Sequence, residues 1–248
     1  VMLTVGLIGA GRIGRVHAST IVQDEGSQLV AVADSVDENA KNLAKLYKVN
    51  PRSVDAIFED NSIEAILIAS STDTHSDFIE KASKAGKAIL CEKPVDLSLA
   101  RAKRCLENTK SNEHSIMMGF NRRFDPNFVA LKNALDKGEI GTAEMLSITS
   151  FDPAPPPIDY VKVSGGIFKD MMIHDFDMAN FLYGELPKSV FVSASAIIDQ
   201  KIRALGDYDT AVATMKYRDG RLAVIRNSRR ATYGYDQRIE VLGSKGLL

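Results

Sequence analysis

The segment Gly9-Ala10-Gly11-Arg12-Ile13-Gly14 constrains the fold of this 248-residue chain more than any other feature. It follows a short apolar run at residues 3–8 and opens an amphipathic stretch at residues 13–22. Glycines at this spacing allow a tight turn, close approach of the backbone to a pyrophosphate and close packing of a helix on a strand. The helix N-terminus adds free N–H groups and the positive end of the helix dipole. The segment therefore predicts a strand, a turn and a helix that bind a dinucleotide.

An acidic residue, Asp34, stands at the end of the second apolar run, as dinucleotide binding requires. Its carboxylate can accept hydrogen bonds from both ribose hydroxyls, whereas a 2′-phosphate would meet like charge. The neighbouring Ser35 cannot neutralise such a phosphate as an arginine would. We therefore expect NAD rather than NADP. A glycine-rich turn capped by an aspartate, without a cofactor, is the alternative interpretation.

Short apolar runs alternate with amphipathic stretches up to about Gly119, a pattern typical of a doubly wound parallel sheet with crossover helices. The predicted strands are residues 3–8, 29–33, 65–69, 88–91 and 115–119. The predicted helices are residues 13–22, 38–47, 75–85 and 98–110, and Ser98 is the expected cap of the last. We predict a Rossmann-type domain over residues 1–120.

The pattern changes after this point and predicts a second, α+β domain over residues 121–248 with a mostly antiparallel sheet. Its predicted helices are residues 127–137 and 168–183. Its predicted strands are residues 144–151, 189–198, 210–217, 221–229 and 238–242. The prolines of Asp152-Pro153-Ala154-Pro155-Pro156-Pro157 exclude a helix and predict a stiff loop. Only two residues follow the turn Gly243-Ser244-Lys245-Gly246, so we expect this domain to be cut short at Leu248.

Composition argues against several other classes of protein. Lys and Arg number 31 and Asp and Glu 32, so no overall charge attracts nucleic acid or an anionic membrane. Two cysteines, Cys91 and Cys105, are too few for a disulfide framework, and no apolar run approaches the ~18 residues that span a bilayer. We expect a cytoplasmic globular protein with reduced thiols. Four scattered arginines are interpreted as pocket and sheet residues rather than a nucleic-acid patch: Arg122, Arg123, Arg229 and Arg230.

Two polar segments follow predicted strands and should lie at the carboxyl edge of the first sheet, where open α/β sheets bind ligands. In the first, Ser70, Thr72 and His75 are expected to border the cofactor. His75 has two competing interpretations, a catalytic residue and a helix-cap or surface residue.

The second segment is Cys91-Glu92-Lys93-Pro94. Glu92 and Lys93 are expected beside the cofactor, and Lys93 can hydrogen-bond a substrate hydroxyl and stabilise negative charge on its oxygen. The alternative for Lys93 is a solvated surface lysine. Cys91 is interpreted as a small apolar strand residue rather than a nucleophile.

A further constellation lies between Gly165 and Asp175, where Asp170 and His174 are four positions apart on a predicted helix and would share a face. Histidine has an ordinary pKa near 6.5, so His174 can accept a hydroxyl proton at neutral pH. Asp170 can orient the His174 ring or bind a neighbouring substrate hydroxyl. Two alternatives remain: a buried structural histidine, and a metal site of His174 with Asp170, Asp175 or Asp177. Because hydride transfer needs no metal, we expect none.

Taken together, these motifs resemble the Gfo/Idh/MocA family of NAD(P)-dependent sugar and polyol oxidoreductases, over nearly the whole chain. The general marks are the glycine segment, the Glu92-Lys93-Pro94 triplet, and the Gly-Gly, Asp, His-Asp order from Gly165 to Asp175. Three motifs resemble family members that act on inositols: Gly119-Phe120-Asn121-Arg122-Arg123-Phe124-Asp125-Pro126, the stretch from Asp152 to Pro157, and Tyr233-Gly234-Tyr235-Asp236-Gln237-Arg238.

The resemblance implies NAD-dependent oxidation of an inositol, with Lys93, Asp170 and His174 as the catalytic triad and Arg123 and Tyr233 in the substrate pocket. It also implies a second domain with a large open sheet, whose exposed face forms dimers or tetramers. Dehydrogenation of another polyol or sugar, and a non-catalytic dinucleotide sensor, remain alternative functions.

This chain departs from the family pattern at two positions. Phe151 stands where close relatives carry Arg, and Met172 where they carry Thr, which would remove polar groups near the substrate and change the preferred polyol. Family members also continue past Leu248.

Overall fold

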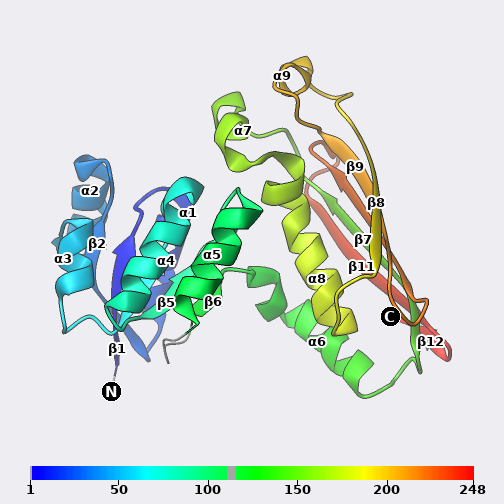
Figure 1. Cartoon of the computed structure of the whole chain (residues 1–248), viewed down its shortest axis with the longest axis horizontal. Helices are drawn as coiled ribbons and strands as arrows, with labels where there is room; N and C mark the ends of the chain where they lie inside the picture. Colours follow the sequence, from blue (N-terminus) through cyan, green and yellow to red (C-terminus); the bar gives the residue numbers. More distant parts are fainter. Residues whose placement is uncertain (1, 111–115) are drawn as a thin grey trace. The chain divides into compact units, whose positions relative to one another are not determined.

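Each strand predicted in the N-terminal half takes part in one six-stranded parallel sheet, in the order β3-β2-β1-β4-β5-β6. The computed structural model describes residues 2–110 and 116–248, and the chain divides into two units, Val1–Gly119 and Phe120–Leu248 (Figure 1). The first unit consists of β1 (Leu3–Ile8), α1 (Arg12–Gln23), β2 (Ser27–Ala33), α2 (Asp37–Tyr47), β3 (Asn50–Pro51), α3 (Val54–Glu59), β4 (Ala65–Ile68), η1 (Thr72–Thr74), α4 (His75–Lys84), β5 (Ala88–Cys91), α5 (Leu99–Thr109) and β6 (Ile116–Met118).

Alternating strand residues of this sheet enter two separate cores, one on each face. Val5 and Leu7 of β1 pack with α1 and α2, whereas Ile8 packs on the other face with α3, α4 and α5. The strand order is that of a dinucleotide-binding Rossmann sheet, whose switch point lies between β1 and β4. The carboxyl ends of β1, β4 and β5 therefore lie side by side at one edge of the sheet, as predicted.

The sequence patterns located most of these elements, and Ser98 caps α5 by accepting a hydrogen bond from the N–H of Arg101 at 3.4 Å. They missed β3 and α3. The strand β3 has two exposed residues, one of them a proline, and α3 has six residues, so neither is long enough to show a periodic pattern. The predicted strand at 115–119 begins at Ser115, which lies outside the described residues.

The second unit is built on a six-stranded sheet in the order β12-β11-β7-β10-β9-β8. Only the β7–β10 pair is parallel among its described pairs, so the expectation of a mostly antiparallel sheet is confirmed. The elements are η2 (Asn121–Phe124), α6 (Pro126–Asp136), β7 (Ala143–Phe151), α7 (Ile158–Ser164), η3 (Ile167–Met172), α8 (Ile173–Tyr183), β8 (Ser189–Ser195), α9 (Gln200–Ala204), β9 (Thr210–Lys216), β10 (Leu222–Ser228), β11 (Asp236–Gly243) and β12 (Gly246–Leu247).

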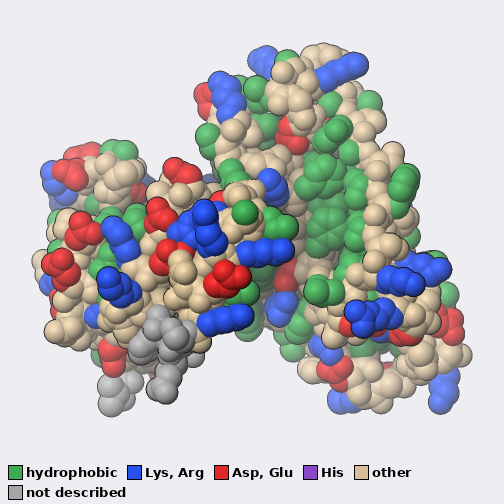
Figure 2. Space-filling view, in the orientation of Figure 1, with side chains coloured by type: hydrophobic (Ala, Val, Ile, Leu, Met, Phe, Trp, Pro, Cys, Tyr) green, Lys and Arg blue, Asp and Glu red, His purple; other side chains and the backbone are tan. Residues whose placement is uncertain are grey.

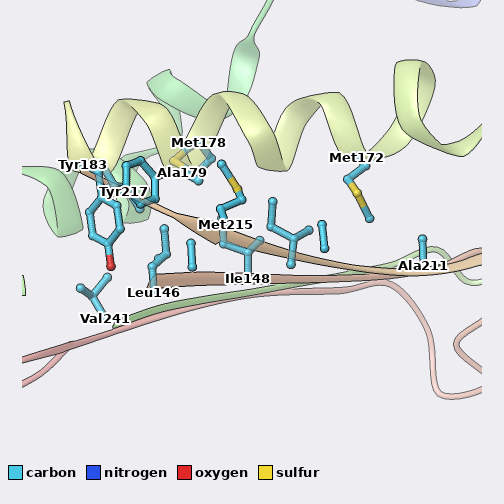
Figure 3. Packing of buried hydrophobic residues seen from close by; sticks show 14 of the residues in the cluster. Leu146, Ile148, Met172, Met178, Ala179, Tyr183, Ala211, Met215, Tyr217 and Val241 are labelled. Carbon is cyan, nitrogen blue, oxygen red and sulfur yellow. The ribbon is translucent and has the colours of Figure 1, made fainter. Parts of the chain in front are cut away.

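The helix α8 lies along one face of this sheet and supplies much of the second core (Figure 3). Met178, Ala179 and Tyr183 of α8 face Leu146 and Met215 of the strands. The helix ends at Gly184, whose φ of +72° suits a left-handed cap.

The predicted α-helix over residues 168–183 is wrong in its first part, because η3 is a π-helix that starts after Gly166, a residue with φ of +77°. The proline loop is free of helix as predicted, but the short helices α7 and α9 were missed. They have seven and five residues, fewer than a helical pattern needs to show its period.

The surface of the first unit carries acidic and basic side chains side by side on the face shown in Figure 2. This matches the balanced composition, with a net charge of −1. Each helix within residues 2–110 and 116–248 is too short or too polar to cross a membrane.

Candidate active site

The turn after β1 has the backbone geometry that a pyrophosphate site needs. Gly9 has φ of +104°, and a Cβ at this position would lie 2.3 Å from the carbonyl oxygen of Ala69. At Gly14 a Cβ would lie 1.9 Å from the carbonyl oxygen of Gly9, so helix α1 can pack on β1 only with a glycine here. At Gly11 a Cβ would meet nothing within 4 Å, so this is the open side of the turn. The three glycines thus fit the roles of turn, approach and packing.

The open side of this turn continues into the N-terminus of α1. Arg12 and Ile13 are the first two helical residues and both are exposed. The first N–H groups of an α-helix have no partner within the helix and point along its axis. The turn and helix can therefore hold an anionic diphosphate at Gly11, Arg12 and Ile13.

Asp34 also holds the turn together. Its Oδ2 accepts a hydrogen bond from the N–H of Ala10 at 2.6 Å, and its Oδ1 accepts one from the N–H of Val36 at 2.8 Å. A carboxylate offers about four lone-pair sites, so acceptor capacity remains for the two hydroxyls of a ribose. Asp34 therefore caps the glycine-rich turn, as the alternative interpretation expected, and this role is compatible with binding a cofactor.

The loop after β4 is tied to the loop after β5 by His75. This side chain is buried, with Nδ1 2.7 Å from the carbonyl oxygen of Pro94 and Nε2 3.1 Å from that of Ser70. Ser70 also bonds through its hydroxyl to Thr74 at 2.7 Å, and Thr72 opens η1 beside it. His75 is therefore neither a surface residue nor placed to take a substrate proton, because both of its ring nitrogens face main-chain oxygens.

The segment after β5 carries a second polar pair. Nε2 of His17, on α1, donates to Oε1 of Glu92 at 2.7 Å. Lys93 follows directly and is partly buried, which argues against a fully solvated lysine. Cys91 is a core residue, and burial raises the pKa of its thiol, so the interpretation as a small apolar strand residue is confirmed.

In the second unit, Asp170 lies on η3 and is held from two sides. Its Oδ1 accepts a hydrogen bond from the hydroxyl of Tyr160 at 2.7 Å, and its Oδ2 lies 3.8 Å from Nη1 of Arg229. His174 lies one turn later, at the start of α8, with its ring edge-on to Phe120 at 6.3 Å between centroids. Asp170 thus lies in a π-helical turn rather than in the α-helix that the sequence predicted, and His174 begins the second turn of the segment.

Asp175, next to His174, is completely buried and anchors the start of α8. Its Oδ1 accepts from Arg122 at 2.5 Å and from the hydroxyl of Ser150 at 2.6 Å, and its Oδ2 accepts from the amide of Asn227 at 2.7 Å. A carboxylate held in this way is unavailable to a metal ion. Its contacts instead fix the backbone that carries His174.

Arg123 and Tyr233 make ion pairs or hydrogen bonds of their own. Nε and Nη2 of Arg123 form a bidentate pair with Asp177 at 2.8 and 2.6 Å, so Asp177 too is engaged. Tyr233 is 68% exposed, and its hydroxyl donates to Asp236 at 2.6 Å. Over the described residues, no group of three or more His, Cys, Asp or Glu side chains could hold a metal ion.

The two departures from the family pattern lie away from this polar network. Met172 is fully buried in the core between α8 and the sheet (Figure 3), where its side chain packs among apolar residues. Ser150 faces Asp175, and successive strand residues point to opposite faces, so Phe151 lies on the other side of the sheet.

Sequence reasoning missed Tyr160, His17 and the role of Arg229. Nothing in the pattern around Tyr160 or His17 distinguishes them from surface residues. Arg229 had a detectable signal, since it continues the alternation of Ala223, Ile225 and Asn227 on the buried face of β10.

Comparison with known proteins covers both units. Residues 3–120 match the oxidoreductase family with an NAD-binding Rossmann fold, Gfo/Idh/MocA, and residues 128–248 match the C-terminal domain of that family. The inositol 2-dehydrogenase of Rhizobium meliloti strain 1021 is 53% identical over 241 residues, which are 97% of this chain and 73% of that protein.

Two solved structures share this fold along the whole chain. The myo-inositol dehydrogenase of Corynebacterium glutamicum has a TM-score of 0.96 at 42% identity, covering 100% of this chain and 74% of that one. The scyllo-inositol dehydrogenase of Lactobacillus casei, solved with bound NAD(H) and scyllo-inositol, has a TM-score of 0.90 at 28% identity, with 100% and 76% covered.

The His17–Glu92 pair predicts a pH dependence. Burial raises the pKa of Glu92, but the hydrogen bond and charge of His17 and the charge of Lys93 outweigh it and hold that pKa below its ordinary value. The pair therefore stabilises the fold fully above the unfolded pKa of about 4.3, and this contribution is lost as the pH falls through the folded pKa. A carbon-13 NMR titration of the Glu92 carboxyl should find the lowered pKa, and H17Q should raise it. An unchanged titration in H17Q would contradict the pairing.

Proposed function

The chain belongs to the Gfo/Idh/MocA family of oxidoreductases, and from this we propose that it oxidises myo-inositol to 2-keto-myo-inositol (scyllo-inosose) with NAD as the hydride acceptor. The observation that carries the proposal is the 53% identity, over 97% of the chain, to a protein named inositol 2-dehydrogenase. Both units contribute to that similarity, since family models match residues 3–120 and residues 128–248.

The cofactor is NAD, and the first unit fits it in detail. The residues that would hold it are Gly9, Gly11, Arg12, Ile13, Gly14, Asp34, Ser70, Thr72, His75, Glu92 and Lys93. Gly11 leaves open space at the turn, α1 offers its N-terminus to the diphosphate, and Asp34 keeps acceptor capacity for a ribose. His75 contributes by joining the loops that carry Ser70 and Lys93. When bound, the nicotinamide takes up the hydride released by the substrate carbon.

The chain's own residues supply the proton chemistry. We assign His174 as the base that accepts the substrate hydroxyl proton as the carbon–hydrogen bond breaks. Lys93 stabilises the oxygen as it becomes a carbonyl, because an ammonium near that atom favours developing negative charge. Asp170 accepts a hydrogen bond from a neighbouring hydroxyl, and Arg123 and Tyr233 complete the substrate pocket. The Asp175 contacts described above support this assignment, since they fix the start of α8 beside His174.

A related polyol is the nearest alternative substrate, since one structural relative was solved with scyllo-inositol. We also propose that residues 1–120 bind the cofactor, and that residues 121–248 bind substrate and form a homo-oligomer, a dimer or tetramer. The face of the second sheet opposite α8 supports an interface, because its outward register includes exposed Phe191, Val212 and Leu222. Two buried free cysteines agree with the cytoplasmic location expected from the sequence.

The substrate is tested by following NADH absorbance at 340 nm with NAD and a panel of polyols. We expect reduction with myo-inositol, weaker reduction with scyllo-inositol and hexoses, and no reduction without a polyol. Tight NAD binding with no reduction by any polyol would overturn the proposal and favour a dinucleotide sensor.

His174→Ala should lower turnover by about 10²–10⁴-fold, the usual effect of losing a general base. Binding of NADH, followed by fluorescence, should stay nearly unchanged, since His174 lies in the second unit. Turnover equal to that of the unaltered enzyme would remove His174 from the role of base.

Asp34→Ala should weaken binding of NAD more than binding of NADP, because only the unmodified ribose uses the carboxylate as an acceptor. Asp34 also holds the N–H groups of Ala10 and Val36, so a thermal unfolding curve must accompany the measurement. Ser35→Ala is the matched control and should bind both dinucleotides as before. Equal losses for NAD and NADP would contradict the ribose role.

A further inference from the structure

Arg229 is a cation buried in the second unit, directly after β10. Its side chain is 1% exposed, and it is the largest of the fully buried side chains. Removing a guanidinium from water is costly unless negative charge lies close to it. Its main-chain N–H is held by the carbonyl oxygen of Asp209 at 2.8 Å, so the backbone position is set independently of the side chain.

Two carboxylates supply that negative charge, one on each side of the guanidinium. Nη1 lies 3.8 Å from Oδ2 of Asp170, and Nη2 lies 3.8 Å from Oδ2 of Asp207. At these distances the pairs are electrostatic contacts rather than hydrogen bonds, and in a buried setting such contacts are weakly screened. Arg229 thus links a carboxylate of the proposed site to one outside it.

Asp207 is itself fixed by the backbone before η3. Its Oδ1 accepts a hydrogen bond from the N–H of Ile167 at 3.1 Å. A Cβ at Gly166 would lie 2.5 Å from this oxygen, and Gly166 has φ of +77°. The positive φ favours glycine at position 166, and the missing side chain lets Asp207 approach closely while it holds one side of Arg229.

Asp170 is consequently held between an outer and an inner contact. Tyr160, which is 45% exposed, donates to Oδ1 from the outer side, and the buried Arg229 faces Oδ2 from within. The field of Arg229 extends to a third acid, Asp152. Burial raises the pKa of Asp152 above its ordinary value, and the charge of Arg229 opposes part of that rise.

We propose that Arg229, braced by Asp207, is a positioning residue that holds the Asp170 carboxylate in the orientation in which it accepts a hydrogen bond from the substrate. The inference rests on the proposed function, because that function gives Asp170 its substrate contact. The same positioning role accounts for the burial of the Arg229 guanidinium and for the close approach of Asp207 at Gly166.

The test is a double-mutant cycle on the full chain, with Arg229→Met, Arg229→Lys, Asp170→Asn and the combination of Arg229→Met with Asp170→Asn. Arg218→Met is the matched control, because Arg218 is an exposed arginine in the turn between β9 and β10. Three quantities are measured for each variant: kcat and KM with the best polyol, the Kd of NADH, and the midpoint of urea unfolding.

Arg229→Met should lower kcat/KM about 10²-fold, the scale of a small misplacement of a catalytic group, and leave the Kd of NADH within about twofold. Arg229→Lys, which keeps the charge, should recover roughly tenfold of that loss. In the Asp170→Asn background, Arg229→Met should cost less than about threefold more, because the group it positions is already altered. Arg218→Met should match the unaltered enzyme.

A loss of the same size in both backgrounds would overturn the proposal, since Arg229 would then act on the fold rather than through Asp170. If Arg229→Met does not fold, the Arg229→Lys variant alone and combined with Asp170→Asn completes the same cycle. The urea data need no substrate, so they separate this inference from the proposed function. If the effects of the two substitutions on the unfolding equilibrium constant differ from additivity by at least about threefold, the contact between Arg229 and Asp170 is supported. Additive effects refute it, even if no polyol is oxidised.

Discussion

A fully buried carboxylate, that of Asp175, holds the start of α8 in the second unit. Asp175 satisfies its charge with Arg122, Ser150 and Asn227, which come from η2, β7 and β10. A carboxyl group buried this deeply is tolerated only while its hydrogen-bond partners stay in place, so the helix start, the sheet and η2 are held as one arrangement. Because His174 is the preceding residue, the same contacts fix the position of its backbone.

The first unit relies on backbone geometry where the second relies on charge. Gly9 and Gly14 allow contacts that a single added carbon would prevent, and Asp34 closes the same turn through two main-chain N–H groups. His75 performs the equivalent task between the loops after β4 and β5. The residues that are expected to touch the ligand are thus few, and each depends on neighbours that do not touch it.

Sequence patterns predicted this organisation unevenly, for physical reasons. The strands β1 and β5 were located to the residue, because a strand of a parallel sheet is buried on both faces and therefore reads as a continuous apolar run between two turns. The elements α3, α7 and α9 were missed because short helices show no period, and η3 was assigned as α because a π-helical turn leaves no known mark in composition. Side-chain pairing between distant segments, as for Arg123 with Asp177, depends on packing that no local pattern records.

The π-helical turn at η3 lies between the polar contacts of Asp170 and the apolar packing of α8 on the sheet. Its wider hydrogen-bonded loop takes up one more residue per turn, which offsets the phase of the helix between Asp170 and the stripe of α8 that packs on the sheet. Within η3, Ile167 and Met172 are buried in the same core as Met178 and Tyr183 of α8, whereas Asp170 contacts the exposed Tyr160. Exchanging the side chain at position 160 or 170 would therefore alter the polar contacts of this turn and leave its apolar interior filled as before.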